Sequence, residues 1–205
     1  TLVIQSGSHG SFLGRLDLRV DGGKVVGFEH RLLTVGEDIP LDGEVQGLVD
    51  DLLRPYREQL DRVVGATATA LNRNTFLEAT MDNLLLDSLI AETGAQLAFS
   101  NGWRYGAPLP PGPVTVNDLY NIIPVNPSVS IVDLKGEEIR AMLEESLEHT
   151  LARDPYDQMG GYLKRFAGLR LYAKAENPHG QRVQAIFVGD RPLLDAETYS
   201  AAFVT

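Results

Sequence analysis

The sequence contains no cysteine and only four histidines among its 205 residues. The lack of cysteine excludes disulfides, a thiol nucleophile and cysteine-ligated zinc. The histidines lie in four separate segments, none with a second histidine or a paired carboxylate at metal-ligand spacing: His9, His30, His149 and His179. We therefore expect no metal centre within this chain. His9 stands in a loop of small residues, which is compatible both with an imidazole beside a site and with an ordinary surface turn.

Positive charge is also scarce, because 18 lysines and arginines stand against 28 acidic residues, for a formal net charge of −10. The basic residues form no cluster, so we expect no nucleic-acid partner. No apolar run approaches the roughly 20 residues that cross a bilayer, so we expect no membrane partner either. Five glutamates are predicted to form the solvated face of one helix: Glu137, Glu138, Glu144, Glu145 and Glu148.

The common catalytic motifs are missing. The chain has no Gly-Lys-Ser/Thr phosphate loop, no dinucleotide glycine fingerprint, no Gly-x-Ser-x-Gly elbow and no His-Glu-x-x-His pair. It also begins without methionine or a visible signal peptide, and we expect it to be part of a longer protein.

The residues that are present predict a hairpin and a helix in the first third of the chain. With 43% hydrophobic residues the whole chain can build a core. Alternation and turn residues predict strands at 2–5, 12–20 and 24–35, the last two joined through Gly22 and Gly23. Apolar residues at helical spacing predict a helix over 44–64 that is kinked at Pro55.

From about residue 66 onward, helices and strands interleave irregularly. We expect a helix over 80–92, N-capped by Thr80 and closed by Gly94, and a short helix that starts with a capping box of Thr115 and Asp118. A third helix is predicted over 137–152. Strands are expected at 95–99, 128–134, 169–173, 183–188 and 199–204. This order predicts an α+β fold, a mixed sheet flanked by helices.

Residues 99–112 place one arginine, Arg104, in a glycine-bounded loop directly after an apolar strand. Gly102 and Gly106 allow the backbone to turn closely around whatever Arg104 reaches. A guanidinium presents a flat fork of donors that suits phosphate, sulfate or carboxylate. The alternative is that Arg104 pairs with an internal carboxylate.

Several segments together resemble the C-terminal part of the 5′-nucleotidase superfamily, hydrolases that join a metallophosphatase domain to a substrate-binding domain. Residues 7–18 look like the last strands of the metallophosphatase domain. The resemblance implies that residues 1–43 are terminal strands of that otherwise missing domain and that residues 44–65 form the interdomain helix. Residues 66–205 would then be the substrate-binding domain, truncated at its C-terminal end.

Within this superfamily the details are most similar to the sulfur-oxidation branch, the Sox-type thiosulfohydrolases. Residues 72–87 are similar to its Arg-x-x-Phe and Thr-Met-Asp-x-Leu pattern, and residues 100–106 to its Ser-x-Gly-x-Arg-Trp-Gly loop. Residues 109–112 and 154–161 are similar to its Leu-x-Pro-Gly and Asp-Pro-Tyr-x-Gln-x-Gly-Gly segments. Nucleotidases clamp the base between two rings, one of them in a Pro-Phe-Gly-Asn motif. Here Pro124-Val125-Asn126-Pro127 has no ring, which disfavours adenosine-type substrates.

The resemblance implies that this chain is the substrate-binding portion of a dinuclear-metal hydrolase acting on a sulfur- or phosphorus-centred anion. Two divalent ions, manganese or zinc, and the catalytic groups would belong to the missing metallophosphatase domain, and the parent protein would be periplasmic or extracellular. The substrate-binding residues would be Arg104 as the grip, Asn101 and Gly102 holding its loop, Tyr105 walling the pocket and, in second rank, Arg73, Gln158, Gly160 and Gly161. The alternatives are a nucleotide phosphohydrolase domain and a non-catalytic ligand-binding module.

Overall fold

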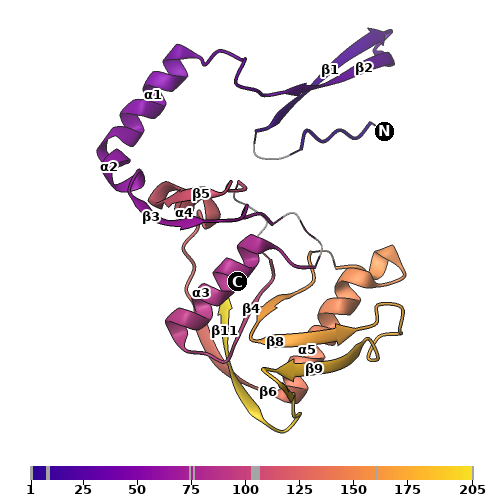
Figure 1. Ribbon diagram of the computed structural model, residues 1–205. Helices are drawn as coiled ribbons and strands as arrows, with labels where there is room; N and C mark the ends of the chain where they lie inside the picture. The colour runs from indigo at the N-terminus through magenta and orange to yellow at the C-terminus, as the bar shows by residue number, and fades with distance from the viewer. Residues whose placement is uncertain are drawn as a thin grey trace. The chain divides into compact units, whose positions relative to one another are not determined.

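The structure is a computed structural model that describes residues 2–7, 10–73, 75, 77–102, 107–159 and 161–204. The chain divides into two compact units, Thr1–Arg62 and Val63–Thr205. Figure 1 shows the course of the chain through both of them.

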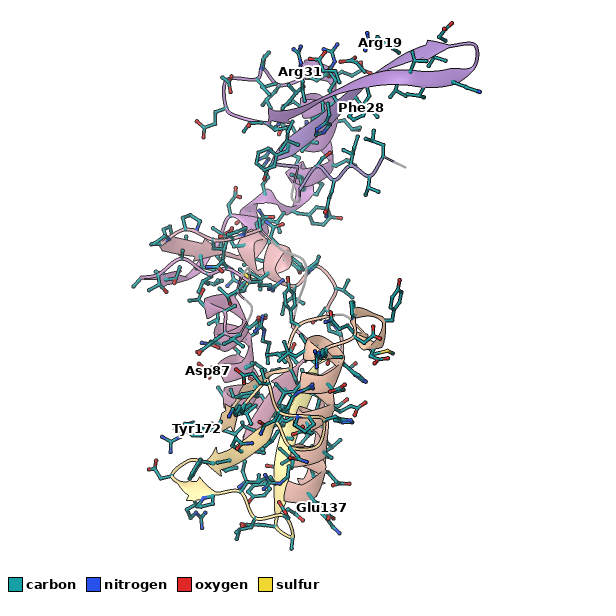
Figure 2. The ribbon with its side chains drawn as sticks, turned by 90° about the vertical axis from the view of Figure 1, so that its right-hand side faces the viewer. Arg19, Phe28, Arg31, Asp87, Glu137 and Tyr172 are labelled. Carbon is teal, nitrogen blue, oxygen red and sulfur yellow. The ribbon has the colours of Figure 1, made fainter. Side chains whose placement is uncertain are left out.

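The first unit begins with a two-stranded hairpin. Strand β1 (Phe12–Asp21) pairs antiparallel with β2 (Lys24–Thr34) through a turn at Gly22 and Gly23, both of which have positive φ. The predicted hairpin is confirmed, whereas the strand predicted at 2–5 is wrong, because those residues have no strand structure. Side chains alternate between the two faces. Phe28 therefore faces the opposite side of the hairpin from Arg31 (Figure 2).

The hairpin is followed by helix α1 (Gly43–Leu53), a 3₁₀ turn η1 (Arg54–Tyr56) and helix α2 (Arg57–Leu60). The side chain of Asp42 caps α1 by accepting the backbone N–H groups of Glu44 and Val45. Pro55 lies in the 3₁₀ turn, so the predicted interruption is confirmed. The helix ends at Leu60 and not at Val64, because Val63–Thr67 forms strand β3, which pairs with strand β5 (Gly112–Thr115).

The second unit is built on a four-stranded mixed sheet with the strand order β6-β11-β4-β7. Its strands are β4 (Leu97–Ser100), β6 (Ser130–Lys135), β7 (Arg165–Ala167) and β11 (Thr198–Val204). The pair β11 and β4 is parallel, and the two outer pairs are antiparallel. The expected mixed sheet flanked by helices is therefore confirmed.

Helices cover both faces of this sheet (Figure 1). On one face Ala98 and Ala202 pack against α3 (Thr80–Thr93), because small side chains allow the helix to lie close to the strands. On the other face Leu97 and Phe99 pack against α5 (Gly136–Leu151). The same core includes a three-stranded antiparallel sheet, β8 (Leu169–Ala173), β9 (Val183–Val188) and β10 (Arg191–Pro192).

A third cluster joins the start of α3 to β5 (Gly112–Thr115) and α4 (Val116–Ile122). Its buried members are Leu71, Met81, Leu109 and Ile122. The predicted capping box at the start of α4 is confirmed, because Thr115 accepts the backbone N–H of Asp118 and the Asp118 carboxylate accepts that of Thr115. A short 3₁₀ turn, η2 (Pro155–Asp157), follows α5.

The prediction for the start of α3 is wrong. Ala79 occupies the N-cap position, and Thr80 is the first helical residue. The Thr80 hydroxyl instead accepts the backbone N–H of Asn72 at 3.0 Å and donates to the carbonyl of Ala70 at 2.8 Å, so it ties the preceding segment to the helix. The other end is as predicted, because Gly94 closes α3 with a φ of +69°.

The expectation of a fully solvated glutamate face on α5 is also wrong. Glu137, Glu138 and Glu145 are exposed, but Glu144 is buried, with 8% of its surface accessible. Its carboxylate accepts the backbone N–H groups of Arg182 at 2.8 Å and Val183 at 2.7 Å. The β8–β9 connection docks on this face, which periodicity along α5 alone does not reveal. Among the described helices, none has the length and apolar composition to span a bilayer.

Candidate functional site

A cavity of about 300 Å³ lies in the second unit beside the C-terminal half of α5. Three segments form it: the residue after β4, one face of α5 and the segment that leads into β7. The lining residues are Asn101, Met142, Glu145, Ser146, His149, Thr150, Gly161, Tyr162 and Lys164. Asn101 and Lys164 meet because Ser100 of β4 is paired with Arg165 of β7, so the neighbouring residues lie at the same edge of the sheet.

Lys164 is the cation of this cavity. Its ammonium donates to the Asn101 side-chain oxygen at 2.9 Å, and its backbone N–H donates to the Ser146 hydroxyl at 2.9 Å. The side chain is half-buried, and this burial lowers the pKa of Lys164 from its ordinary value. Among the described residues, no carboxylate lies within 4.0 Å of the ammonium.

A buried ion pair adjoins the cavity through the lining residue Tyr162. Arg165 lies 3.1 Å from the carboxylate of Asp82, and the two side chains are only 2% and 3% exposed. Arg165 also donates to the carbonyls of Thr75 and Leu77 and lies 5.1 Å from the centre of the Tyr162 ring. The guanidinium is thus neutralised internally and joins α3, the segment before it and β7.

The first turn of the loop after β4 requires glycine at position 102. Gly102 has a φ of +78°, and its N–H donates to the Ser100 hydroxyl at 3.1 Å. A β-carbon at this position would lie 3.2 Å from Cδ2 of Tyr162, which is tighter than an ordinary contact. Position 102 therefore combines a left-handed backbone with close approach to an aromatic ring.

Of the predicted substrate-binding residues, Asn101 and Gly161 line this cavity, and Gly102 contacts its wall through Tyr162. Two others lie elsewhere: Arg73 is buried and donates to the Ile122 carbonyl at 2.6 Å, and the Gln158 amide donates to the Ala152 carbonyl at 2.9 Å. Four residues weighed from the sequence lie outside the described residues: His9, Arg104, Tyr105 and Gly160.

Two histidines converge on one carboxylate at the rim of the cavity. Glu145 lies 2.7 Å from Nε2 of His149, one helical turn away, and 3.5 Å from Nε2 of His179 in the β8–β9 connection. The two histidines are 30 residues apart in the sequence, and only the docking of that connection on α5 brings them together. Within the described part of the chain, no three or more His, Cys, Asp or Glu side chains are arranged to hold a metal ion.

The neighbouring Glu144 shows how the same docking is stabilised. Burial raises the pKa of this carboxyl, but the backbone N–H groups of Arg182, Val183 and Gly180 and the nearby His179 lower it by more, so the net shift is downward. Arg182 in turn forms an ion pair with Glu148. Helix α5, which forms one wall of the cavity, is therefore held by contacts of Glu144 and Glu148 with the β8–β9 connection.

Residues 61–204 match the family model of the 5′-nucleotidase C-terminal domain. The chain belongs to this family. Among solved structures it is similar to the sulfate thiohydrolase SoxB of Thermus thermophilus in complex with glycerol, with 29% identity, a TM-score of 0.87, and coverage of 95% of this chain and 36% of that one. A 5′-nucleotidase precursor from Thermus thermophilus gives 26% identity and a TM-score of 0.80, and the match covers 95% of this chain and 40% of that one.

Curated relatives agree with this assignment. The trifunctional nucleotide phosphoesterase protein YfkN of Bacillus subtilis is 26% identical over 98% of this chain and 14% of its own length. A 5′-nucleotidase of Diplobatis ommata is 25% identical over 96% of this chain and 37% of its own length. The chain thus spans from about a seventh to over a third of these relatives. It is a C-terminal domain of the type found in 5′-nucleotidases and SoxB enzymes.

Proposed function

We propose that this domain binds a sulfur- or phosphorus-centred anion for a metal-dependent hydrolase of the thiosulfohydrolase kind. The observation that carries the proposal is the segment 124–127, where the resemblance to nucleotidases calls for a stacking ring and this chain has Val125, 61% exposed. A valine side chain has no aromatic face for a base. The structural similarity to the sulfate thiohydrolase over 95% of the chain also supports a sulfur- or phosphorus-centred anion as the ligand.

In this proposal Arg104 is the substrate grip, with Asn101 and Gly102 holding its loop and Tyr105 walling the pocket. Arg73, Gln158, Gly160 and Gly161 are the second-rank contacts. The cavity supports this assignment in part, because Asn101 and Gly161 come from distant segments of the sequence and line the same cavity.

The hydrolytic chemistry would come from two divalent ions, manganese or zinc, held by a metallophosphatase domain outside this chain. Residues 1–43 would be terminal strands of that domain, 44–65 its connection and 66–205 the substrate-binding domain. The parent protein would act in the periplasm or outside the cell. This chain by itself is then expected to bind the anion without hydrolysing it.

A nucleotide phosphohydrolase is the second candidate. It is favoured by the relatives that carry the name 5′-nucleotidase and by the likeness to the 5′-nucleotidase precursor. A base would then be stacked by residues other than those at 124–127. A ligand-binding module without chemistry is the third candidate.

Calorimetric titration of this chain distinguishes the first two candidates. We expect thiosulfate and inorganic phosphate to bind and adenosine monophosphate to bind no more tightly than phosphate, since the base finds no ring. Arg104→Met should weaken thiosulfate binding at least tenfold, whereas Arg191→Met, at an exposed arginine on β10, should leave it unchanged. Adenosine monophosphate binding ten times tighter than phosphate would favour the nucleotidase instead.

A turnover assay of the full-length protein distinguishes an enzyme from a binding module. Supplied with manganese or zinc, the full-length protein should release sulfate from a thiosulfonate substrate faster than it releases phosphate from adenosine monophosphate. If the protein binds anions but turns over neither substrate class, the ligand-binding module without chemistry would be the supported candidate.

A further inference from the structure

Two buried cations in the described part of this domain, Arg165 and Arg182, are neutralised by carboxylates, whereas the half-buried cation that lines the cavity contacts a neutral group. Arg165 is paired with Asp82 and Arg182 with Glu148. The Lys164 ammonium is half-buried, yet its described contact is the neutral amide oxygen of Asn101. Withdrawing a charge from water without a counter-charge costs free energy, which is why burial lowers the pKa of Lys164. An anion bound in the cavity would supply the missing counter-charge.

Two hydroxyl side chains, those of Ser146 and Thr150, line the same cavity as this ammonium. The Ser146 oxygen accepts the backbone N–H of Lys164, so its own proton is left to donate toward the cavity. Thr150 lies one helical turn further along α5 and lines the same cavity. An ammonium and two hydroxyl donors around about 300 Å³ suit one small anion with several oxygens.

The acidic residue of the cavity does not prevent anion binding. Glu145 is the carboxylate among the lining residues, and its side chain is 53% exposed, so water screens its charge. Its two oxygens also lie next to imidazoles, His149 on one side and His179 on the other. The Lys164 ammonium contacts Asn101 instead, on the side of the cavity formed by β4 and β7.

We propose that Lys164, assisted by the hydroxyls of Ser146 and Thr150, binds a tetrahedral oxyanion such as sulfate, phosphate or the sulfonate end of thiosulfate. This inference rests on the proposed function in that the oxyanion is the charged group of the substrate. Lys164 is then a binding residue that the sequence motifs did not reveal. No covalent bond is made or broken at Lys164. Its positive charge makes the cavity selective for anions.

Binding of sulfate, inorganic phosphate and thiosulfate to this chain tests the inference, measured by calorimetry at pH 7 and constant ionic strength. Lys164→Met should weaken binding of all three at least tenfold, and Lys164→Arg should recover part of the loss. Lys174→Met, at an exposed lysine of the β8–β9 connection, is the matched control and should change affinity less than twofold. Affinity of Lys164→Met within twofold of the native chain would overturn the inference.

Thermal unfolding separates a binding role from a structural one. If Lys164 is retained for a ligand, Lys164→Met should unfold at the same or a higher temperature than the native chain without anion, because an uncompensated buried charge is removed. Asn101→Asp places a carboxylate against the ammonium, and it should raise the unfolding temperature and weaken anion binding together. A lower unfolding temperature for both variants would assign Lys164 to the scaffold.

The outcome for Lys164 is separable from the outcome for hydrolysis. If the full-length protein, supplied with manganese or zinc, binds anions through Lys164 but shows no turnover, the proposed hydrolase is overturned and this inference stands. Turnover that survives Lys164→Met with unchanged KM would overturn the inference and leave the hydrolase standing.

Discussion

At the scale of single residues, buried ion pairs hold the fold, whereas Lys164 and Glu145 are charged groups that line a cavity. Asp82 and Arg165 are both buried, and taking two charges from water costs several kcal/mol per ion unless contact and hydrogen bonds repay it. Here Arg165 also donates hydrogen bonds to the carbonyls of Thr75 and Leu77, which offset part of this cost. The pair therefore fixes the segment before α3 against β7 and belongs to the scaffold beside the cavity.

Removing one partner of this pair should be costly. We expect Asp82→Asn to lower the free energy of unfolding by about 3–5 kcal/mol, because Arg165 stays buried without its carboxylate. Urea unfolding followed by circular dichroism measures the loss. Asp195→Asn, which breaks the exposed pair with Arg140, is the matched control and should cost less than about 1 kcal/mol. Equal losses in the two variants would contradict a structural role for the buried pair.

At the scale of elements, two faces of helix α5 make different contacts. One side lines the cavity through Ser146 and Thr150, and the other holds the β8–β9 connection through Glu144. The Glu144 carboxylate accepts two backbone N–H groups, those of Arg182 and Val183, where the connection enters β9. These N–H groups need an acceptor at this point. The position of the cavity wall therefore depends on a carboxylate that does not reach the cavity.

The acid sensitivity of the domain should reflect this contact. The folded-state pKa of Glu144 lies below its ordinary value of 4.5, so Glu144 contributes stability above that pH and loses the contribution as pH falls through the folded-state value. We expect Glu144→Gln to lower the free energy of unfolding at pH 7 by about 1–3 kcal/mol and to flatten its decline below about pH 4.5.

Urea unfolding at a series of pH values measures this effect. Glu137→Gln, on the exposed face of the same helix, is the control and should reproduce the native profile. An unchanged slope below about pH 4.5 in Glu144→Gln would show that another group carries the acid dependence.

At the scale of the whole molecule, the two units differ in what can stabilise them. All three hydrophobic clusters of buried residues belong to Val63–Thr205, whereas the described residues of Thr1–Arg62 include none that is buried. An isolated hairpin and helix are marginal in water without a core. The first unit therefore has no buried core among its described residues to stabilise it.

Separate expression of the units tests this difference. Residues 63–205 alone should show dispersed amide resonances and one cooperative thermal transition, because the clusters are complete within them. Residues 1–62 alone should show the narrow amide dispersion and rapid hydrogen exchange of a largely unfolded chain. Loss of the cooperative transition in residues 63–205 would mean that the first unit is needed for the core.

Strands and turns with strong local signals were predictable. Strands β8 and β9 have the predicted bounds, and Gly94 and the Thr115 capping box end or begin their helices as expected. Strands β3, β5 and β7 were not predicted, because they are short and β5 contains Gly112 and Pro113. Their strand structure comes from hydrogen bonding to neighbours that lie far away in the sequence.

The sequence motifs marked two of the residues that line the cavity, and their role in substrate binding stays a prediction. Asn101 and Gly161 were expected from their segments, and both line the cavity. Lys164 carried no signal, because its position depends on the pairing of Ser100 with Arg165 and its environment on α5. The pairing of Asp82 with Arg165 was not predictable either, since the two residues lie far apart along the chain.

The amino-acid sequence by itself determined the family, the alternation that places Leu97 and Phe99 on one face of a strand, and the turns that end its elements. These properties are local, because they depend on neighbours within a few positions. Only the tertiary structure decided which charges are neutralised, since electrostatic energy depends on distance in space and on burial. It paired Arg165 with Asp82, buried Glu144 and left Lys164 facing a cavity.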